Sequence, residues 1–395
     1  MSGKILFISG LALLAGVFIL LLPAPQQGDL RPKGGSRLKN RLAELMVKEG
    51  ATVHREIENF SFVNKRISPT DSENCDNYND SFVFQGYDPD QGVGFLTRLG
   101  FRDDGELTEV WFWLDVDGKI YYNRDQFFRN DPRDTEGIAK GGVSFRSLKD
   151  DEFEIRWSGP MEPAAEQVEV SFTFKGDSAH YLMSEHMDPR AFGMAMAEMK
   201  WSREYFNQLR SEGADRYERG GVTTGTVKIG GQPERTVELP GFRDRSWGKR
   251  NWLYINRYIW NLVTLDGDLV IDGRAYRYII YTTADYGTTF SHLVSGWMGG
   301  TDGVVPISYA SDMTALGEDG KVPREYTTSF RVKDSPDLLT LSVKARPAGH
   351  SWLVAEEGFE VNETFAEFEI NGIRGQGMQE FGYNLDHYPL GRRKK

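Results

Sequence analysis

The chain is organised around Leu239-Pro240-Gly241-Phe242-Arg243-Asp244-Arg245-Ser246-Trp247-Gly248-Lys249-Arg250, where two aromatic rings stand among charges of both signs. Burying an ion without a partner costs much free energy, so this stretch is not an ordinary apolar strand. Residues 251–261 continue the mixture with further aromatic and polar side chains. We therefore expect residues 239–261 to line a functional site.

The composition indicates a folded, mainly β protein. The 395 residues are 39% hydrophobic and 13% aromatic, with 43 glycines, which favours strands and turns over helices. This length is typical of roughly two domains. The net charge of −11 argues against binding to nucleic acid, which needs a basic surface. Cys75 is the only cysteine, so an intrachain disulfide is excluded and we interpret it as structural.

The first 26 residues are typical of a membrane-directed segment, either a signal anchor or a signal peptide. Lys4 precedes an apolar run from Ile5 to Leu22, which is about one bilayer helix long. Prolines after the run make a poor cleavage context, which favours a retained anchor. Basic residues on both sides leave the topology open. We expect a single-pass membrane protein, in the endoplasmic reticulum or secretory pathway rather than on the cytosolic face.

Three Asn-x-Ser/Thr triplets favour the same location. They predict glycosylation at Asn59, Asn79 and Asn362.

Residues 27–57 combine a linker with an amphipathic helix. Between Leu38 and Glu49, the apolar side chains Leu38, Leu42, Leu45 and Met46 share one helical face. This face packs on the domain or lies on the membrane surface, and we favour packing.

From Ser61 the pattern changes to short alternating runs that predict antiparallel strands. Glu109 to Tyr122 reads as a hairpin around Asp117-Gly118. Asp188-Pro189 predicts a helix start, and a second β set begins near Tyr217. The predicted organisation is a membrane segment (1–26), linker and helix (27–57), first β-domain (58–187), connecting helix (188–212), second β-domain (213–388) and basic tail (389–395).

A resemblance joins these observations. Gly241-Phe242-Arg243-Asp244-Arg245-Ser246-Trp247-Gly248, preceded by Tyr217-Glu218-Arg219 and followed by Gly375-Gln376-Gly377-Met378-Gln379-Glu380-Phe381-Gly382, resembles the tandem-lipocalin superfamily. That group includes carotenoid 1,2-hydratases, AttH-like proteins, fungal hydratase and cycloaddition enzymes, and tocopherol-cyclase-like proteins. The resemblance implies two lipocalin-like antiparallel β-barrels joined by a central helix. Barrels of about eight strands have interiors suited to one apolar ligand.

The resemblance also implies which residues carry the chemistry. The family's turn reads Asp-His-Ser-Trp-Gly, and in the carotenoid hydratases its polar and aromatic residues are implicated in catalysis. Asp244 and Trp247 match this motif, whereas Arg245 stands in the place of the histidine. Arginine stays protonated and cannot serve as an ordinary acid or base, so carotenoid chemistry does not transfer unchanged.

Hydrating or cyclising an isoprenoid double bond needs a shielded acid and aromatic faces that stabilise a cation. The candidate catalytic residues are Asp244, Trp247, Arg245 and Glu380, and the candidate ligand-binding residues are Trp252, Tyr254, Trp260, Arg243 and Glu218. The alternative is structural: Asp244 forms a buried ion pair with Arg243 or Arg245, and Trp247 belongs to the core.

We predict no cofactor and no metal, and interpret His180 and His186 near Glu185 as polar surface.

Three functions therefore stay open. The first is a cofactor-independent enzyme that hydrates, isomerises or cyclises a long isoprenoid or polyene lipid at a membrane. The second is a non-catalytic carrier of a hydrophobic small molecule, and the third is a structural role at the membrane. The partners we expect are this small molecule and, through the N-terminal helix, the membrane.

Overall fold

The computed structural model describes residues 37–50, 62–68, 76–103, 106–130, 137–149, 151–211, 213–311 and 316–387. The predicted membrane segment, Asn59, Cys75 and the basic tail lie outside these ranges. Within them, no helix has both the length and the apolar character needed to cross a membrane.

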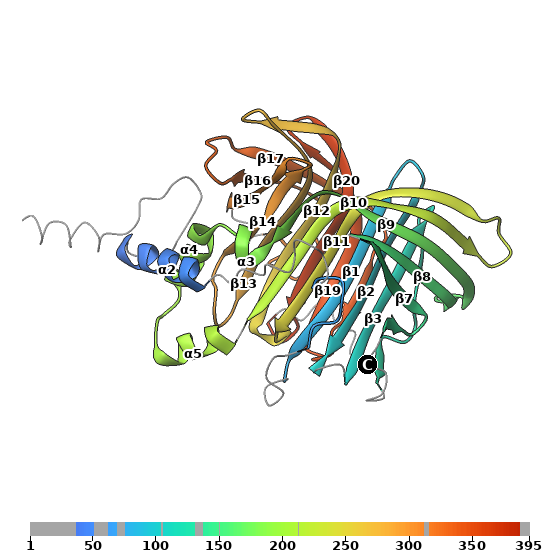
Figure 1. Ribbon diagram of the computed structural model, residues 1–395, viewed down its shortest axis with the longest axis horizontal. Helices are drawn as coiled ribbons and strands as arrows, with labels where there is room; N and C mark the ends of the chain where they lie inside the picture. Colours follow the sequence, from blue (N-terminus) through green and yellow to red (C-terminus); the bar gives the residue numbers. More distant parts are fainter. Residues whose placement is uncertain are drawn as a thin grey trace, which may run out of the picture.

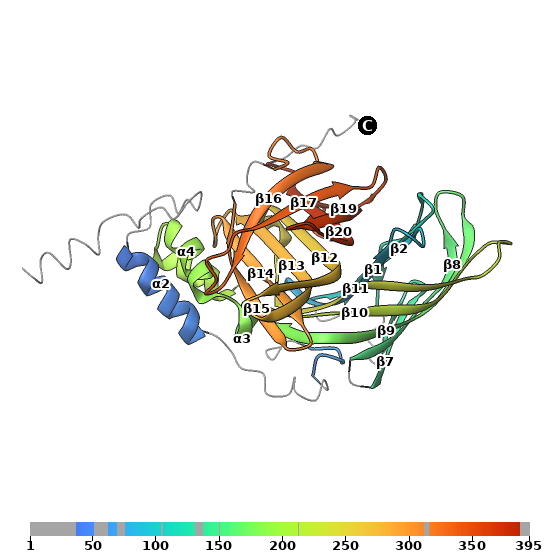
Figure 2. The same cartoon turned by 90° about the horizontal axis from the view of Figure 1, so that it is seen from above.

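The first sheet combines strands from both halves of the chain (Figure 1). Its order is β4-β3-β2-β1-β11-β10-β9-β8-β7-β6, and β5 pairs with β3. The described strands end at β4 and β6, which do not pair with each other, so this sheet is curved but not fully closed (Figure 2). An isolated bridge, Tyr122↔Glu162, joins the end of β4 to the segment after β8. Its strands are β1 (Tyr78–Asp88), β2 (Val93–Arg102), β3 (Leu107–Val116), β4 (Lys119–Tyr122), β5 (Phe127–Arg129), β6 (Ile138–Lys140), β7 (Val143–Lys149), β8 (Glu152–Met161), β9 (Glu166–Leu182), β10 (Ala214–Ile229) and β11 (Arg235–Lys249).

The second sheet closes on itself. Its order is β17-β16-β15-β14-β13-β12-β20-β19-β18, and β17 also pairs with β19, which completes the ring. The short 3₁₀ helix η4 (Trp252–Tyr254) leads into it. Its strands are β12 (Ile255–Ile271), β13 (Arg274–Tyr286), β14 (Leu293–Gly300), β15 (Gly303–Ala310), β16 (Glu325–Val332), β17 (Leu339–Ala345), β18 (His350–Leu353), β19 (Phe359–Ile370) and β20 (Ile373–Asn384). The predicted mainly β architecture is therefore confirmed.

The predicted boundary between the two β-domains is wrong. β10 and β11 were expected to open the second domain at residue 213, but β10 pairs with β9 and β11 pairs with β1. The chain passes from one sheet to the other between β11 and β12, at η4. The first sheet is therefore completed only by strands that follow the connecting helices.

The hairpin predicted at Asp117-Gly118 is confirmed. β3 pairs antiparallel with β4 up to Val116↔Lys119. The two turn residues have φ of 53° and 85°, which is the left-handed conformation that Asp-Gly adopts readily in a two-residue hairpin.

The single helix predicted over 188–212 is two helices in the structure, α4 (Pro189–Glu198) and α5 (Arg203–Ser211), and a short helix α3 (Met183–His186) precedes them. The predicted helix start is confirmed, because the Asp188 side chain accepts a hydrogen bond from the Arg190 N–H. The Trp201 indole donates to the carbonyl of Met196 at the end of α4, at 2.9 Å. Ser202 then accepts the N–H of Tyr205 and starts α5, which explains the break.

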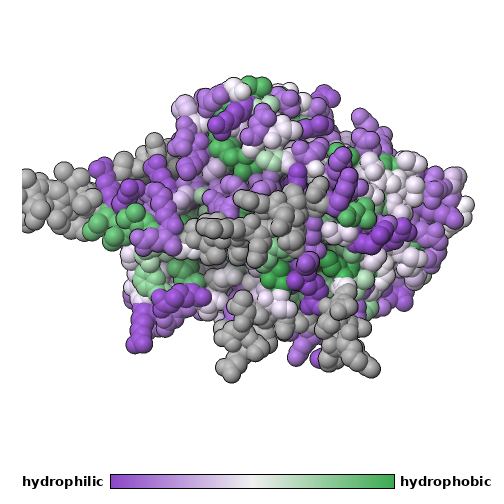
Figure 3. All heavy atoms as spheres, in the orientation of Figure 1, coloured by the Kyte–Doolittle hydropathy of each residue, from purple (hydrophilic) through white to green (hydrophobic). Residues whose placement is uncertain are grey.

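The predicted amphipathic helix is α2 (Arg37–Gly50), and it packs against α4. Ala43 is fully buried there, and a Cβ on Gly193 would collide with the α2 backbone. The packing face differs from the predicted one, since Leu42 and Leu45 are 44% and 41% exposed. Figure 3 shows this apolar patch over α2, at the left of the molecule.

Three large apolar clusters explain how the sheets pack. One lies within the first sheet and includes Phe82 and Phe84; another lies within the closed second sheet and includes Val263 and Phe381. The third contains side chains from both sheets and from α4, and therefore lies between them. Side chains of the first two clusters fill the interior of each sheet. A large cavity lies between the sheets.

Candidate functional site

The charged stretch of the sequence forms β11, and strand alternation divides it between two faces. Arg243, Arg245 and Trp247 point to one side, while Asp244 and Ser246 line a cavity on the other. All five side chains are at most 6% exposed. The two sets of residues therefore have different surroundings and different tasks.

The face of β11 that carries Arg243, Arg245 and Trp247 stabilises the fold. The Arg243 guanidinium pairs with Asp151 and donates to the carbonyl of Val63 at 2.6 Å. Arg245 pairs with Asp80 and donates to the carbonyls of Ser81 and Lys65. Trp247 packs in a small core cluster with Val63, Leu182 and Tyr217, edge-on to Phe62. The sequence placed these three residues in the site, and the structure places them behind it.

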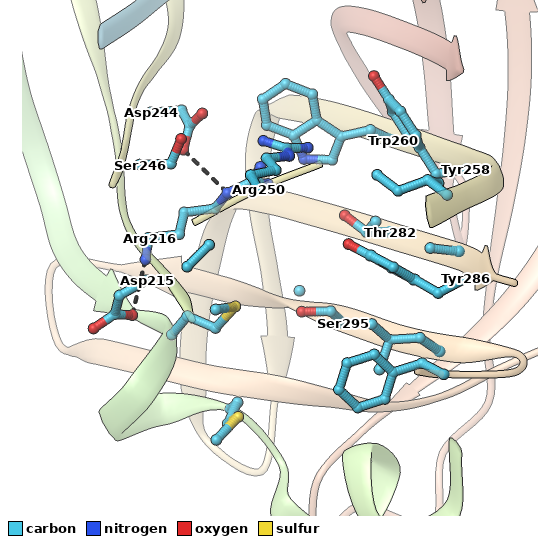
Figure 4. A pocket seen from close by; sticks show the side chains of 18 of the residues that line it. Asp215, Arg216, Asp244, Ser246, Arg250, Tyr258, Trp260, Thr282, Tyr286 and Ser295 are labelled. Carbon is cyan, nitrogen blue, oxygen red and sulfur yellow. Dashed lines mark hydrogen bonds and ion pairs between the residues drawn. The ribbon is translucent and has the colours of Figure 1, made fainter. Parts of the chain in front are cut away.

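Asp244 joins a charged cluster on the cavity side. Arg216, on the neighbouring strand β10, lies between two carboxylates: its Nε is 3.4 Å from Asp244 Oδ1 and its Nη1 is 3.3 Å from Glu218 Oε1. Trp297, on the second sheet, donates its indole N–H to Glu218 Oε2 at 2.7 Å. The ion pair expected between Asp244 and Arg243 or Arg245 is therefore replaced by one with Arg216 (Figure 4).

The cavity has a volume of about 570 Å³ and is bounded by both sheets and by α2, α4 and α5. The helices and β14 supply mainly apolar side chains, including Met46, Met196 and Leu293. The polar groups come chiefly from β10 to β14, from the segment between β11 and β12, and from β19 and β20. Figure 4 shows several of them around the space: Asp244, Arg216, Arg250, Tyr258, Trp260, Tyr286 and Ser295.

A pair of buried glutamates forms part of the cavity wall. Glu363 on β19 and Glu380 on β20 are directly opposite each other in register and hydrogen-bond through their carboxyl groups. Glu363 also accepts the indole N–H of Trp113 at 2.7 Å and of Trp352 at 2.9 Å. Glu380 accepts the hydroxyl of Tyr258. Both carboxyl groups therefore have a fixed geometry.

Burial favours the protonated form of this pair. Burial, reinforced by the neighbouring Glu380, raises the pKa of Glu363 well above its usual value. Burial also raises the pKa of Glu380, although Tyr258 and Arg216 oppose the change. Two carboxyl groups this close in a dry site repel each other when both are ionised, which favours one proton for the pair.

Of the residues selected from the sequence, Asp244, Glu218, Glu380, Trp252 and Trp260 meet at this cavity. Tyr254 lies half-buried in η4 and does not line it. The sequence analysis missed Arg216, Glu363 and Tyr258. A signal for Glu363 existed: it shares a strand face with Val361 and Phe365, and a carboxylate between two apolar side chains at alternate positions is unusual.

A family model with the description "Domain of unknown function (DUF7064)" matches residues 68–384. The chain belongs to this family.

The DUF7064 chain also shares its fold with solved structures. A protein assigned as AttH from Nitrosomonas europaea is 12% identical, with a TM-score of 0.51, covering 78% of this chain and 93% of that one. Kievitone hydratase from Nectria haematococca is 11% identical, with a TM-score of 0.51, covering 82% and 95%. At these identities the likeness shows the fold alone, and this fold is the one that the sequence resemblance implied. No curated protein has a sequence that matches the chain.

The two predicted glycosylation sites within the described residues, Asn79 and Asn362, differ in how accessible they are to a glycan. Asn79 is 1% exposed, and its amide oxygen accepts a hydrogen bond from Arg98 at 3.1 Å. A glycan has no room there, so this prediction is corrected. Asn362 is half-buried on β19, and its side chain accepts a hydrogen bond from Ser351.

The histidines show no metal site in the described residues, which contain no group of three or more potential ligands. His186 instead accepts the backbone N–H of Leu182 at 2.9 Å through Nδ1, and the His180 ring stacks on Tyr217. His180 and His186 are therefore explained by local packing.

Glu218 gives the DUF7064 chain a pH-dependent stability. Burial raises its pKa from 4.5 to about 7, although Arg216 opposes the change. Between these values the folded chain retains a proton that the unfolded chain has released, so the free energy of unfolding falls as the pH rises. We expect Glu218→Gln to remove this pH dependence. Between pH 5 and pH 8 the free energy of unfolding of the variant should rise by about 1–3 kcal/mol relative to that of the wild type. Urea unfolding at several pH values measures the difference, and parallel curves for the two proteins would contradict it.

Proposed function

We propose that this DUF7064 chain binds a hydrophobic, unsaturated molecule between its two sheets and protonates it through Glu380. The observation that carries the proposal is the pair of buried, adjacent carboxyl groups of Glu363 and Glu380 in the wall of a largely apolar cavity, where burial raises the pKa of both. A carboxyl group that keeps its proton at neutral pH can act as a general acid, and burial is the usual way in which a protein produces one.

The aromatic side chains around the pair suit a reaction through a cation. Trp252, Tyr258 and Trp260 line the same cavity, and ring faces stabilise a positive charge by about 0.5–2 kcal/mol each. The Tyr258 hydroxyl is bonded to Glu380, so this ring lies next to the acid. A proton delivered to one carbon of a double bond would leave a positive charge on the other carbon, close to these rings.

Addition of water is the reaction that we favour. Glu380 gives a proton to one alkene carbon, a water oxygen bonds to the other, and the proton that this water loses returns to the glutamate pair. The net change is one water added, and neither an oxidant nor a cofactor is needed. The shared fold with a protein named kievitone hydratase supports hydration as the first reaction to test. Loss of a neighbouring proton in place of water addition would give isomerisation.

A non-catalytic carrier is the second candidate. Its motivation was Arg245 in the position of the family histidine, and the structure weakens that motivation because Arg245 faces away from the cavity. The carrier function therefore depends only on the cavity itself.

Isotope incorporation separates the candidates. The full chain is purified, its bound lipophilic molecules are extracted and identified, and each is then incubated with fresh protein in D₂O or in H₂¹⁸O. Hydration introduces both labels into the product, whereas isomerisation introduces deuterium alone. Recovery of an unlabelled, unchanged ligand indicates a carrier and would overturn the proposed catalysis.

We also propose that α2 rests on a membrane surface at the entrance to the cavity. Leu42, Leu45 and Met46 are 39–44% exposed, while Met46, Val47 and Gly50 of the same helix line the cavity. The apolar run at Ile5–Leu22, of membrane-spanning length, precedes α2 in the chain. An apolar ligand could then pass from the bilayer to the cavity without crossing water.

Site-directed fluorescence tests this placement. In full-length protein reconstituted into vesicles, with Cys75→Ser, we expect a polarity-sensitive fluorophore on Leu45→Cys to emit at shorter wavelength than one on Val270→Cys. Val270 is a suitable control because it is apolar and 63% exposed on the second sheet. Equal emission from the two positions would contradict membrane contact at α2.

A further inference from the structure

Several buried hydrogen-bond donors in the cavity wall have no acceptor. Trp111, Trp252 and Trp260 line the cavity and are 3–6% exposed, and their buried indole N–H groups donate to no other group of the described chain. A buried tryptophan normally finds a partner for its N–H, and a donor left without one costs about 1–3 kcal/mol. Unsatisfied donors gathered around one cavity indicate that acceptors arrive with the ligand.

The other tryptophans of the same interface show the contrast. Trp113 and Trp352 donate to Glu363, and Trp297 donates to Glu218. The chain therefore supplies acceptors to indoles where it holds its own acids in place. At Trp111, Trp252 and Trp260 it supplies none.

Arg250 adds a charged donor to this set. Its guanidinium lies 3.9 Å from the ring centre of Trp252 and lines the cavity. No described carboxylate forms a salt bridge with it, whereas Arg98 pairs with Glu109 and Arg216 pairs with Asp244. A guanidinium carries five N–H donors, so Arg250 can bind one or more oxygen atoms of a ligand. Figure 4 shows Arg250 next to Trp260 at the polar end of the cavity.

The charges nearby decide what kind of oxygen fits. The cavity lining holds the cations Arg98, Arg210, Arg216 and Lys249, of which Arg98 and Arg216 are paired with carboxylates. It also holds Asp215 and Asp244, and the glutamate pair lies within electrostatic reach of Arg250. An anionic ligand would meet these carboxyl groups at close range. A neutral carbonyl or hydroxyl oxygen accepts the same hydrogen bonds without that repulsion.

We infer that the ligand is an amphipathic molecule whose polar end carries neutral carbonyl or hydroxyl oxygens, which accept hydrogen bonds from Trp252, Trp260 and Arg250. Its apolar body lies against the methionine and phenylalanine side chains of the helices. This inference rests on the proposed function, in that it takes the cavity to be the ligand site. It excludes a bare hydrocarbon polyene as the preferred ligand, because such a molecule would displace water from these donors without offering them a hydrogen-bond acceptor.

Three probes with one ring system test the inference: 2-ethylanthracene, 2-acetylanthracene and anthracene-2-carboxylate. They present no acceptor, one neutral carbonyl and one anion, respectively, on bodies of similar shape. We expect the full-length wild type to bind the acetyl compound about ten-fold or more tightly than the ethyl compound, as measured by the change in probe fluorescence. One hydrogen bond to a charged or otherwise unsatisfied donor is enough for this ratio.

Variants locate the effect. Trp260→Phe and Arg250→Met remove donors while they keep most of the apolar volume, and we expect each to lower the acetyl preference several-fold with little change for the ethyl compound. Trp157→Phe is the matched control, because the Trp157 N–H is also buried without an acceptor but lies in the first-sheet cluster away from the cavity. It should leave the preference unchanged, and circular dichroism checks that each variant is folded.

The possible failures are distinguishable. Equal binding of the ethyl and acetyl compounds, or a preference that survives both Trp260→Phe and Arg250→Met, overturns the inference while the ligand cavity stands. Tighter binding of the carboxylate than of the acetyl compound overturns the neutral-oxygen assignment. Absence of binding by all three probes counts against the inference and against the cavity as the ligand site.

Discussion

Replacing Glu380 by glutamine is expected to lower turnover of the ligand by about 100-fold or more, with little change in ligand affinity. Glutamine has nearly the same shape and can still bond to Tyr258, but it cannot give up a proton to a carbon atom. A general acid contributes roughly 10²–10⁴-fold to a rate. Single-turnover kinetics with the labelled ligand would measure the chemical step, and equilibrium binding would measure affinity separately.

Asp244→Asn serves as the comparison for this prediction. Asp244 lines the same cavity, but it is ion-paired with Arg216 and does not belong to the glutamate pair. We expect a smaller loss of turnover in this variant than in Glu380→Gln. The opposite ranking, with full activity in Glu380→Gln, would assign the acid to Asp244 and remove the glutamate pair from the mechanism.

Replacing Arg245 by methionine is expected to destabilise the fold by about 3–5 kcal/mol, which is the second large effect. Arg245 is fully buried, pairs with Asp80 and donates to the carbonyls of Ser81 and Lys65. Removing one partner of a buried ion pair leaves an uncompensated charge and unsatisfied acceptors, which is far more costly than losing an exposed pair. Urea unfolding followed by tryptophan fluorescence would measure the change.

The double variant Asp80→Asn/Arg245→Met provides the control, because it removes both charges. It should be less destabilised than the sum of the two single variants. A loss below about 1 kcal/mol in Arg245→Met would show that the pair contributes little. Folded Arg245→Met should keep its affinity for the ligand, since Arg245 does not line the cavity.

The charged stretch on β11 was only partly interpretable from the sequence. Its density of ions and aromatic rings correctly marked a special region. The motif does not act as a single unit, however, because a strand sends successive side chains to opposite faces. Asp244 therefore lines the cavity, while Arg243, Arg245 and Trp247 hold the adjoining segment around Val63 in place.

The position of the cavity could not be predicted from alternation. β2 is buried at every position and β1 at all but its last, because one face packs within the first sheet and the other against the second. A strand with two buried faces carries no period-two signal that distinguishes them. The existence of the strands was therefore predictable, but which face contacts the ligand was not.

The glutamate pair depends on register, which a single sequence does not contain. Glu363 and Glu380 are opposite each other only because β19 and β20 pair from Ile370↔Ile373 outward. Their acidity further depends on Trp113, which reaches Glu363 from the first sheet. The sequence could nominate Glu380 by resemblance, but its partner required the fold.

The neighbour relation between β1 and β11 has a consequence for how the protein is made. Ser81 and Ser246 face each other across these strands although they are 165 positions apart in the chain. A ribosome must therefore complete well over half of the polypeptide before β1 can gain its second neighbour. During that interval β1 presents an open edge, which is the kind of surface that invites wrong pairing and chaperone binding. Nascent chains ending before β11 should consequently be protease-sensitive, whereas those that include it should acquire resistance in the region of β1.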